Sequence, residues 1–194
     1  MKPHIIILFL LLSISCKTQV QKPKKNMERF NITQFRAFQK NGEYTQVLKD
    51  AEINQYEYAD GYAEKITPAK GWFYDYKDFY QSGQLRSQGK MFICGDYKAG
   101  LWIECDKNGN IISQTDYDSK YRMKLEDIFK ILEARKIPFF RENSINKINR
   151  EIISNQAIWY IKWQVVHDRI ETLNIDDVTR SIIKQGFINF ASDH

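Results

Sequence analysis

The chain has few of the residues that most often build metal sites and nucleophilic catalytic sites. It contains only three histidines, His4, His167 and His194, and three cysteines. The two cysteines of the central region, without nearby histidines, do not fill the tetrahedral shell of a zinc ion. His167, beside Asp168, is typical of an exposed turn residue, because no nucleophile motif accompanies it. We therefore expect no metal ion and no catalytic residue.

Signals for nucleotide cofactors are also missing. The sequence has no phosphate-binding glycine-rich loop, Walker motif or dinucleotide fingerprint, so we predict no cofactor. Two carboxylate pairs, Asp116/Asp118 and Asp176/Asp177, could in principle perform acid–base chemistry. Both occur in turn-like contexts, where aspartate commonly binds its own backbone, so we expect them to be structural.

Beyond the first 25 residues there is no excess of positive charge. The whole chain has 29 Lys and Arg residues against 24 Asp and Glu residues. Residues 1–25 contain five lysines and no acid, which leaves 24 charges of each sign in the remainder. A nucleic-acid partner is therefore not expected, since it requires a basic face on the folded domain. The lysines after residue 16 fit a tether that lies along anionic headgroups or in solvent.

The N-terminus has the features of an export signal. After Met1–His4, the segment Ile5–Ser15 contains only apolar residues and serine, and it is too short for a comfortable transmembrane helix. The following "LLSISC", ending at Cys16, resembles the lipobox of bacterial lipoproteins. In that family signal peptidase II cleaves before the cysteine, and diacylglycerol is attached to its sulfur. This resemblance implies a lipid on Cys16 and a membrane location, at the periplasmic face of the outer membrane. A plain cleaved signal and an uncleaved anchor are the alternatives.

An internal repeat dominates the middle of the chain. The segment Tyr80–Met91 returns 26 residues later as Asp106–Tyr117, with "GDYKAGLW" between the copies. Ser82-Gly83 and Asn108-Gly109 predict tight hairpin turns, and the alternating residues around them predict strands with one buried face. Asn41-Gly42, after "FRAFQK", predicts an earlier, degenerate hairpin.

This pattern resembles bacterial MORN-variant repeats, of the type "Y-x-x-G-x-L-x-S-x-G … G-x-x-x-x-G-x-W", which occur in antitoxin-like and envelope proteins. The resemblance implies hairpins stacked into an elongated antiparallel sheet that serves as a scaffold or binding surface. It implies no shared chemistry. An ordinary β-meander is the alternative.

The periodicity changes after Asp118-Ser119. Leu125, Ile128, Phe129 and Leu132 share one face of a predicted helix, which Pro138 ends. Strands are then predicted at Ile148–Ile153, Ala157–Val166 and Ile170–Ile175, with a further strand at Ser181–Phe190. Asn155-Gln156 and His167–Arg169 are the predicted turns. The fold class is thus α+β and mostly antiparallel, with one helix packed on a three- to four-stranded sheet.

This C-terminal part resembles a PepSY-like module, a family that binds or restrains partners and carries no catalytic residues of its own. The family's ending "Asp-x-x-Thr-Gly" is matched by Asp176–Thr179, but Arg180 replaces the glycine. Glycine tolerates a positive φ at that position, whereas arginine adopts it only at a cost.

The dense aromatic run from Trp72 to Tyr80 is the candidate protein-binding surface. Alternate residues of a strand face opposite sides, and exposed Trp and Tyr are typical interface anchors. The candidate binding residues are Trp72, Tyr74, Tyr76, Tyr80 and Tyr97. The alternative is that stacked hairpins use both sets of rings for internal packing.

Cys94 and Cys105 could form a disulfide. A hairpin that turns within Gly95–Gly100 and closes on Lys98 and Leu101 would place them opposite each other, and an exported protein meets an oxidising compartment. Two buried free thiols are the alternative.

Four segments follow from these patterns: a signal peptide with lipobox at 1–16, a basic linker at 17–29, a MORN-like region at 30–118 and a PepSY-like module at 119–194. We expect a non-enzymatic envelope lipoprotein that binds an unknown envelope protein or toxin, with toxin neutralisation as one role. The alternatives are a structural or assembly-associated lipoprotein and an envelope hydrolase whose site matches no motif.

Overall fold

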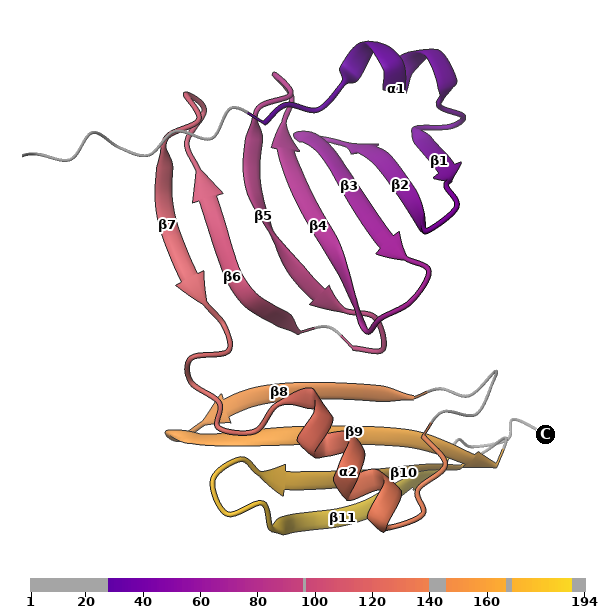
Figure 1. Ribbon diagram of the computed structural model, residues 1–194, viewed down its shortest axis with the longest axis vertical. Helices are drawn as coiled ribbons and strands as arrows, with labels where there is room; N and C mark the ends of the chain where they lie inside the picture. The colour runs from indigo at the N-terminus through magenta and orange to yellow at the C-terminus, as the bar shows by residue number, and fades with distance from the viewer. Residues whose placement is uncertain (1–27, 96, 140–145, 167–168, 190–194) are drawn as a thin grey trace, which may run out of the picture.

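The structure, a computed structural model, describes residues 28–95, 97–139, 146–166 and 169–189. These residues form two antiparallel sheets and two helices, which confirms the predicted α+β class with mostly antiparallel strands. Figure 1 shows the larger sheet above the smaller one, with helix α1 at the far end of the larger sheet and helix α2 against the smaller. Cys16, residues 17–27 of the predicted basic linker and His167 lie outside the described residues. The last linker residue, Arg29, pairs with Gln84 beside the larger sheet.

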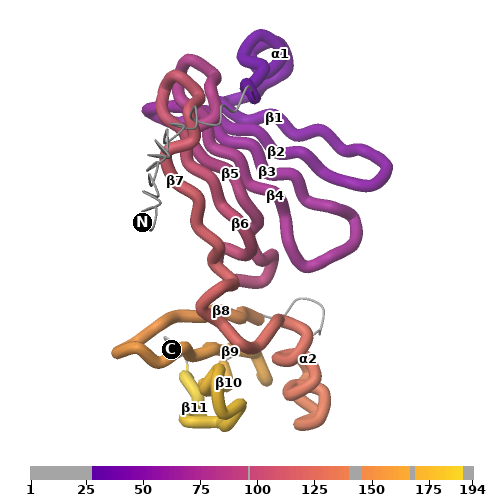
Figure 2. Tube along the Cα trace, turned by 60° about the vertical axis from the view of Figure 1, so that its left-hand side comes forward, coloured from indigo at the N-terminus to yellow at the C-terminus, as the bar shows by residue number. Residues whose placement is uncertain are grey.

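The larger sheet is a meander of seven strands, each paired antiparallel with the next strand in the chain. Figure 2 shows the same order from a second direction. The strands are β1 (Glu43–Val47), β2 (Ala51–Tyr58), β3 (Gly61–Pro68), β4 (Phe73–Tyr80), β5 (Leu85–Phe92), β6 (Lys98–Cys105) and β7 (Ile111–Asp116).

The sequence repeat corresponds to two hairpins with the same turn. In the β4–β5 turn the Gly83 N–H donates to the Tyr80 carbonyl at 2.8 Å, and in the β6–β7 turn the Gly109 N–H donates to the Asp106 carbonyl at 2.9 Å. The two glycines have φ values of 80° and 81°. Each hairpin also has a register shift beside its turn. A turn closed by a left-handed glycine is a common three- to five-residue hairpin connection, and here both copies use it.

The expected early hairpin is wrong in its first half. Residues Ile32–Phe38 form α1 instead of a strand, because Asn31 accepts the Gln34 N–H as an N-cap and Phe35 is fully buried against the sheet. Asn41-Gly42 does make a positive-φ turn, but this turn joins α1 to β1.

A first apolar cluster lies under α1. Its buried members are Phe30, Phe35, Tyr62, Phe79, Leu85 and Cys105. The Phe30 ring stacks on the Tyr62 ring with centroids 4.6 Å apart. We call the side of the larger sheet that carries Tyr62 and Phe79 the α1 face.

The smaller sheet has the strand order β11-β10-β9-β8. Its elements are α2 (Leu125–Ala134), β8 (Lys147–Ile153), β9 (Gln156–Val166), β10 (Arg169–Asp176) and β11 (Ile182–Asn189). These bounds agree closely with the predicted helix and strands. The β8–β9 turn is Ser154-Asn155, one residue earlier than expected, and both residues have positive φ.

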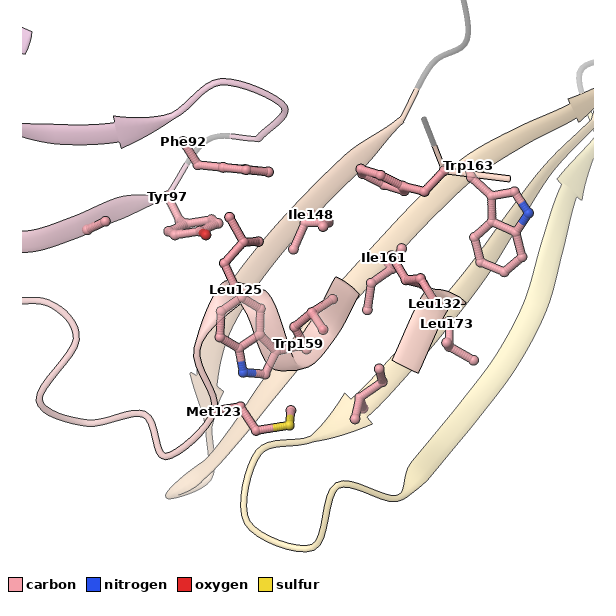
Figure 3. Close-up of a cluster of buried hydrophobic side chains, with 14 residues drawn as sticks. Phe92, Tyr97, Met123, Leu125, Leu132, Ile148, Trp159, Ile161, Trp163 and Leu173 are labelled. Atoms are coloured by element: carbon pink, nitrogen blue, oxygen red, sulfur yellow. The ribbon is translucent and has the colours of Figure 1, made fainter. Parts of the chain in front are cut away.

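The two sheets share one apolar core, shown in Figure 3. Phe92, Tyr97 and Ala99, from the end of the larger sheet, are buried together with residues of α2 and the smaller sheet, among them Leu125 and Trp159. The Tyr97 and Trp159 rings meet edge to face, 5.8 Å apart. We call this cluster the junction core.

The β10–β11 turn contains Arg180, which replaces the glycine of the PepSY-like ending. Asp176 accepts the Val178 and Thr179 N–H groups at 3.1 and 2.6 Å, and Arg180 follows with φ of 60°. The position therefore has the left-handed conformation that glycine favours, although an arginine occupies it.

We predict that Arg180→Gly stabilises the protein. A left-handed residue with a Cβ costs about 1 kcal/mol, so the variant should raise the free energy of unfolding by about that amount in urea denaturation. The matched control is Arg180→Ala, which removes the same exposed ion pair with Asp127 at 4.0 Å and keeps the strained φ. An equal gain from both variants would contradict the explanation.

Candidate functional site

The face of the larger sheet opposite α1 carries a continuous field of aromatic rings, which we call the aromatic face. Strand alternation places Tyr56 and Tyr58 of β2, Tyr74, Tyr76 and Tyr80 of β4, and Trp102 of β6 on this side. Tyr117, directly after β7, joins them through its edge contact with Trp102 at 6.1 Å. The tyrosines are half-buried by one another and keep part of each ring in solvent. Neither described helix covers this face, since α1 packs on the opposite side.

A glycine lets the central tryptophan lie flat on the sheet. Trp102 is buried, and its indole lies over Gly89 of the neighbouring strand. A Cβ added to Gly89 would lie 2.3 Å from the indole atoms. The indole Nε1–H donates to the Lys90 carbonyl at 3.1 Å, and Tyr76 stacks beside the ring at 6.3 Å. The Gly and Trp of the repeat motif are thus partners across β5 and β6.

Two lysines lie over rings of the aromatic face. Lys65 Nζ is 4.4 Å from the Tyr74 ring centroid, and Lys98 Nζ is 4.1 Å from the Trp102 ring and 5.3 Å from Tyr117. In the described part of the chain, neither ammonium group forms an ion pair. Their positive charge is therefore available to a partner's carboxylates.

The α1 end of the aromatic face is held by a charge cluster. Arg86 donates from Nε to Asp78 Oδ2 at 2.6 Å and from Nη2 to Oδ1 at 3.0 Å, a forked pair, and from Nη1 to Asp60 at 2.9 Å. Tyr58 donates a short hydrogen bond to the same Asp78 carboxylate. Burial and this hydrogen bond raise the pKa of Tyr58. The two carboxylates compensate the charge of Arg86, and the cluster fixes the rings around it.

Of the five predicted binding residues, the structure brings together Tyr74, Tyr76 and Tyr80. Trp72 and Tyr97 are not on the aromatic face. Trp72 precedes β4 and packs on Phe129 of α2 with ring centroids 4.9 Å apart, while Tyr97 is buried in the junction core. The prediction for Tyr97 as an exposed anchor is therefore wrong, because the smaller sheet covers it.

The predicted disulfide between Cys94 and Cys105 is also wrong. Met91 pairs with Lys98, so the chain turns between Phe92 and Tyr97 and not at Lys98–Leu101. Cys94 lies within that turn and Cys105 at the other end of β6, roughly 20 Å away at the rise of a strand, whereas a bridge needs Cα atoms within about 7 Å. Both thiols are free, and burial raises the pKa of each, the opposite of an activated thiolate.

The carboxylate pair Asp176/Asp177 has a structural environment. Asp177 is buried and accepts the Arg122 and Met123 N–H groups at 2.6 and 3.0 Å and the Trp159 Nε1–H at 2.9 Å. Asp176 accepts the Gln156 side-chain amide at 2.6 Å as well as the turn N–H groups, and these bonds lower its pKa to about 2. The hydrogen bonds of both carboxylates are thus made within the turn and at the junction of the two sheets.

Within the described residues, no cluster of three or more His, Cys, Asp or Glu side chains could hold a metal ion. No helix among them is long and apolar enough to cross a membrane. All three histidines lie outside the described ranges.

Sequence reasoning missed Tyr56, Tyr58, Trp102 and Tyr117 as members of the aromatic face, and the lysines above the rings. The alternation of Tyr56 and Tyr58 in β2 was a usable signal, since it places both on one side of a strand. Comparison of the chain with protein-family models, curated proteins and solved structures finds no match in any of the three.

We predict that Gly89→Ala disrupts the aromatic face. The added methyl would meet the indole of Trp102, so the ring must move, and overpacking of this kind lowers the free energy of unfolding by about 1–3 kcal/mol. Gly186→Ala in β11 is the matched control, because its nearest neighbour would be at an ordinary 3.5 Å. Equal stability of the two variants in urea denaturation would show that the position of the Trp102 indole does not require a glycine at residue 89.

Proposed function

We propose that this protein is a lipid-anchored envelope protein that binds another protein through the aromatic face. The observation that carries the proposal is the open field of half-buried tyrosines with Lys65 and Lys98 above the rings. Tyr and Trp are among the residues most enriched at the energetic centres of protein interfaces, and a broad, open sheet face suits a protein surface better than a small ligand.

Rigidity supports a binding role for this face. Trp102 is pinned over Gly89, and the forked Arg86–Asp78 pair fixes Tyr58 and Tyr80. Side chains that are already ordered lose little conformational entropy when a partner binds. The aromatic face is thus prepared for recognition without a large rearrangement.

Charge favours a partner with carboxylates at its surface. Arg86 is neutralised by Asp78 and Asp60, whereas Lys65 and Lys98 contribute uncompensated positive charge beside the rings. A partner that places Asp or Glu over these lysines and apolar groups over the tyrosines would complement both features. A toxin and an assembly factor of the envelope are two such partners, and the identity of the captured protein decides between them.

The resemblances to MORN-variant repeats and to PepSY-like modules agree with this role, since both families act by binding. The two hairpins with matching turns support the first resemblance, and the left-handed φ at Arg180 supports the second.

The membrane anchor is proposed from the lipobox-like "LLSISC" alone. We expect radiolabelled palmitate to enter the protein during growth, and Cys16→Ala to abolish the label. Label that persists in Cys16→Ala, or that is absent from both proteins, would exclude a lipid on Cys16.

Reversal of the two lysine charges tests the binding surface. We expect the double variant Lys65→Glu/Lys98→Glu to lose the envelope protein that the parent chain retains in an affinity pull-down, by tenfold or more, because two rim charges would now repel its carboxylates. Lys184→Glu, on exposed β11 of the smaller sheet, is the matched control and should retain the partner. Equal recovery by both variants, with unchanged circular dichroism, would remove the aromatic face from the proposal.

A further inference from the structure

A concave site lies at the junction of the two sheets, away from the aromatic face. Its cavity has a volume of about 320 Å³, within the range that holds a small organic ligand. Its walls include Phe73, Tyr97, Tyr121 and Trp159, and its charged rim is formed by Arg122, Lys124, Arg150, Asp118 and Glu126. The cavity therefore combines aromatic walls with a local excess of one positive charge.

Arg150 supplies the cation of this site. Its side chain is only 5% exposed and lies on the rings of Tyr121 and Tyr97, 4.3 and 4.6 Å from their centroids. Nη2 donates to the Lys98 carbonyl at 2.9 Å and to the Asp118 carboxylate. Among the described residues, Nε and Nη1 have no acceptor. Nη2 thus holds the guanidinium group in place, and Nε and Nη1 can donate to a bound anion.

The start of α2 adds backbone donors to the same cavity. Leu125 and Glu126, the first two residues of the helix, line it. The N-cap is Lys124, whose side chain has no acceptor with which to cap these groups. No acceptor for the Leu125 and Glu126 N–H groups occurs in the described part of the chain. Free N–H groups at a helix N-terminus favour anions.

Tyr97 gives an independent indication of a ligand. Its side chain is buried, yet its hydroxyl has no hydrogen-bond partner. Figure 3 shows the hydroxyl on the side of the ring that faces Leu125 and Trp159. A buried hydroxyl without a partner is costly, and a bound acceptor would satisfy it.

We propose that this cavity binds a monocarboxylate attached to a flat apolar group. The carboxylate would accept from the free Arg150 nitrogens, the α2 N-terminus and the Tyr97 hydroxyl. The apolar group would lie against Phe73 and Tyr121. Asp118 and Glu126 at the rim disfavour a dianion such as phosphate, because like charges repel. The carboxylate belongs either to a small acid or to the C-terminus of a peptide.

Titration with phenylacetate, followed by NMR on the intact protein, tests this site. For a ligand of this size we expect saturable binding with a Kd of about 1 mM, and shifts at the Leu125 and Glu126 amides and the Trp159 indole N–H. Benzylamine, which has the same ring with a positive charge, should not bind. Gly-Gly-Phe that binds more tightly than phenylacetate identifies a peptide terminus as the natural ligand, and weaker binding identifies a small acid.

Tyr97→Phe separates ligand binding from stability. Because the buried hydroxyl has no partner in the protein, its removal should not lower the melting temperature, while the affinity for phenylacetate falls about tenfold, as for loss of a hydrogen bond to a charged group. Tyr160→Phe, on the open side of β9, is the matched control and should bind normally. Unchanged affinity in Tyr97→Phe, equal binding of benzylamine, or no saturable binding by the parent protein would each overturn the proposal. None of these results bears on the aromatic face.

Discussion

The junction core is the contact on which the rest of the structure depends. The end of the larger sheet presents Phe92, Tyr97 and Ala99, which are buried only because α2 and the smaller sheet cover them. A fully buried large apolar side chain contributes about 1.5–3 kcal/mol, so separation of the sheets would be costly at this contact alone. The repeat region and the C-terminal module therefore stabilise each other, and the larger sheet can leave its aromatic face open.

Polar contacts fix the orientation at this junction. The buried Asp177 carboxylate accepts two backbone N–H groups from the segment that leads into α2, together with the Trp159 indole N–H. Arg150 of β8 donates back to the carbonyl of Lys98 in β6. A buried charge that loses its donors is strongly destabilising, so these bonds specify one arrangement of the connection between the sheets. The same arrangement brings the α2 N-terminus and Arg150 to one cavity.

Local chemistry made much of the fold predictable. The left-handed glycines at Gly83 and Gly109 identify the hairpins, and the spacing of Leu125, Ile128 and Leu132 identifies α2, because both signals depend on neighbours in the sequence. Helix α1 was missed, since its one buried residue, Phe35, gives too little periodicity. The pairing of β5 with β6 was misplaced for a different reason: their turn is set by burial of the apolar ends in the junction core, which no local pattern contains.

In the candidate site too, sequence neighbours predicted some features, whereas others depend on tertiary contacts. Alternation along β4 correctly grouped Tyr74, Tyr76 and Tyr80, but it could not show that Tyr97 lies under the smaller sheet or that Trp102 lies over Gly89. Side-chain oxidation footprinting of the captured complex tests the central claim most directly, since it reads the solvent access of individual tyrosines. The account predicts that the partner protects Tyr74, Tyr76 and Tyr80, while Tyr44 on the α1 face and Tyr160 on the smaller sheet keep their reactivity. Protection of Tyr44 or Tyr160 with unchanged oxidation of the aromatic face would contradict it.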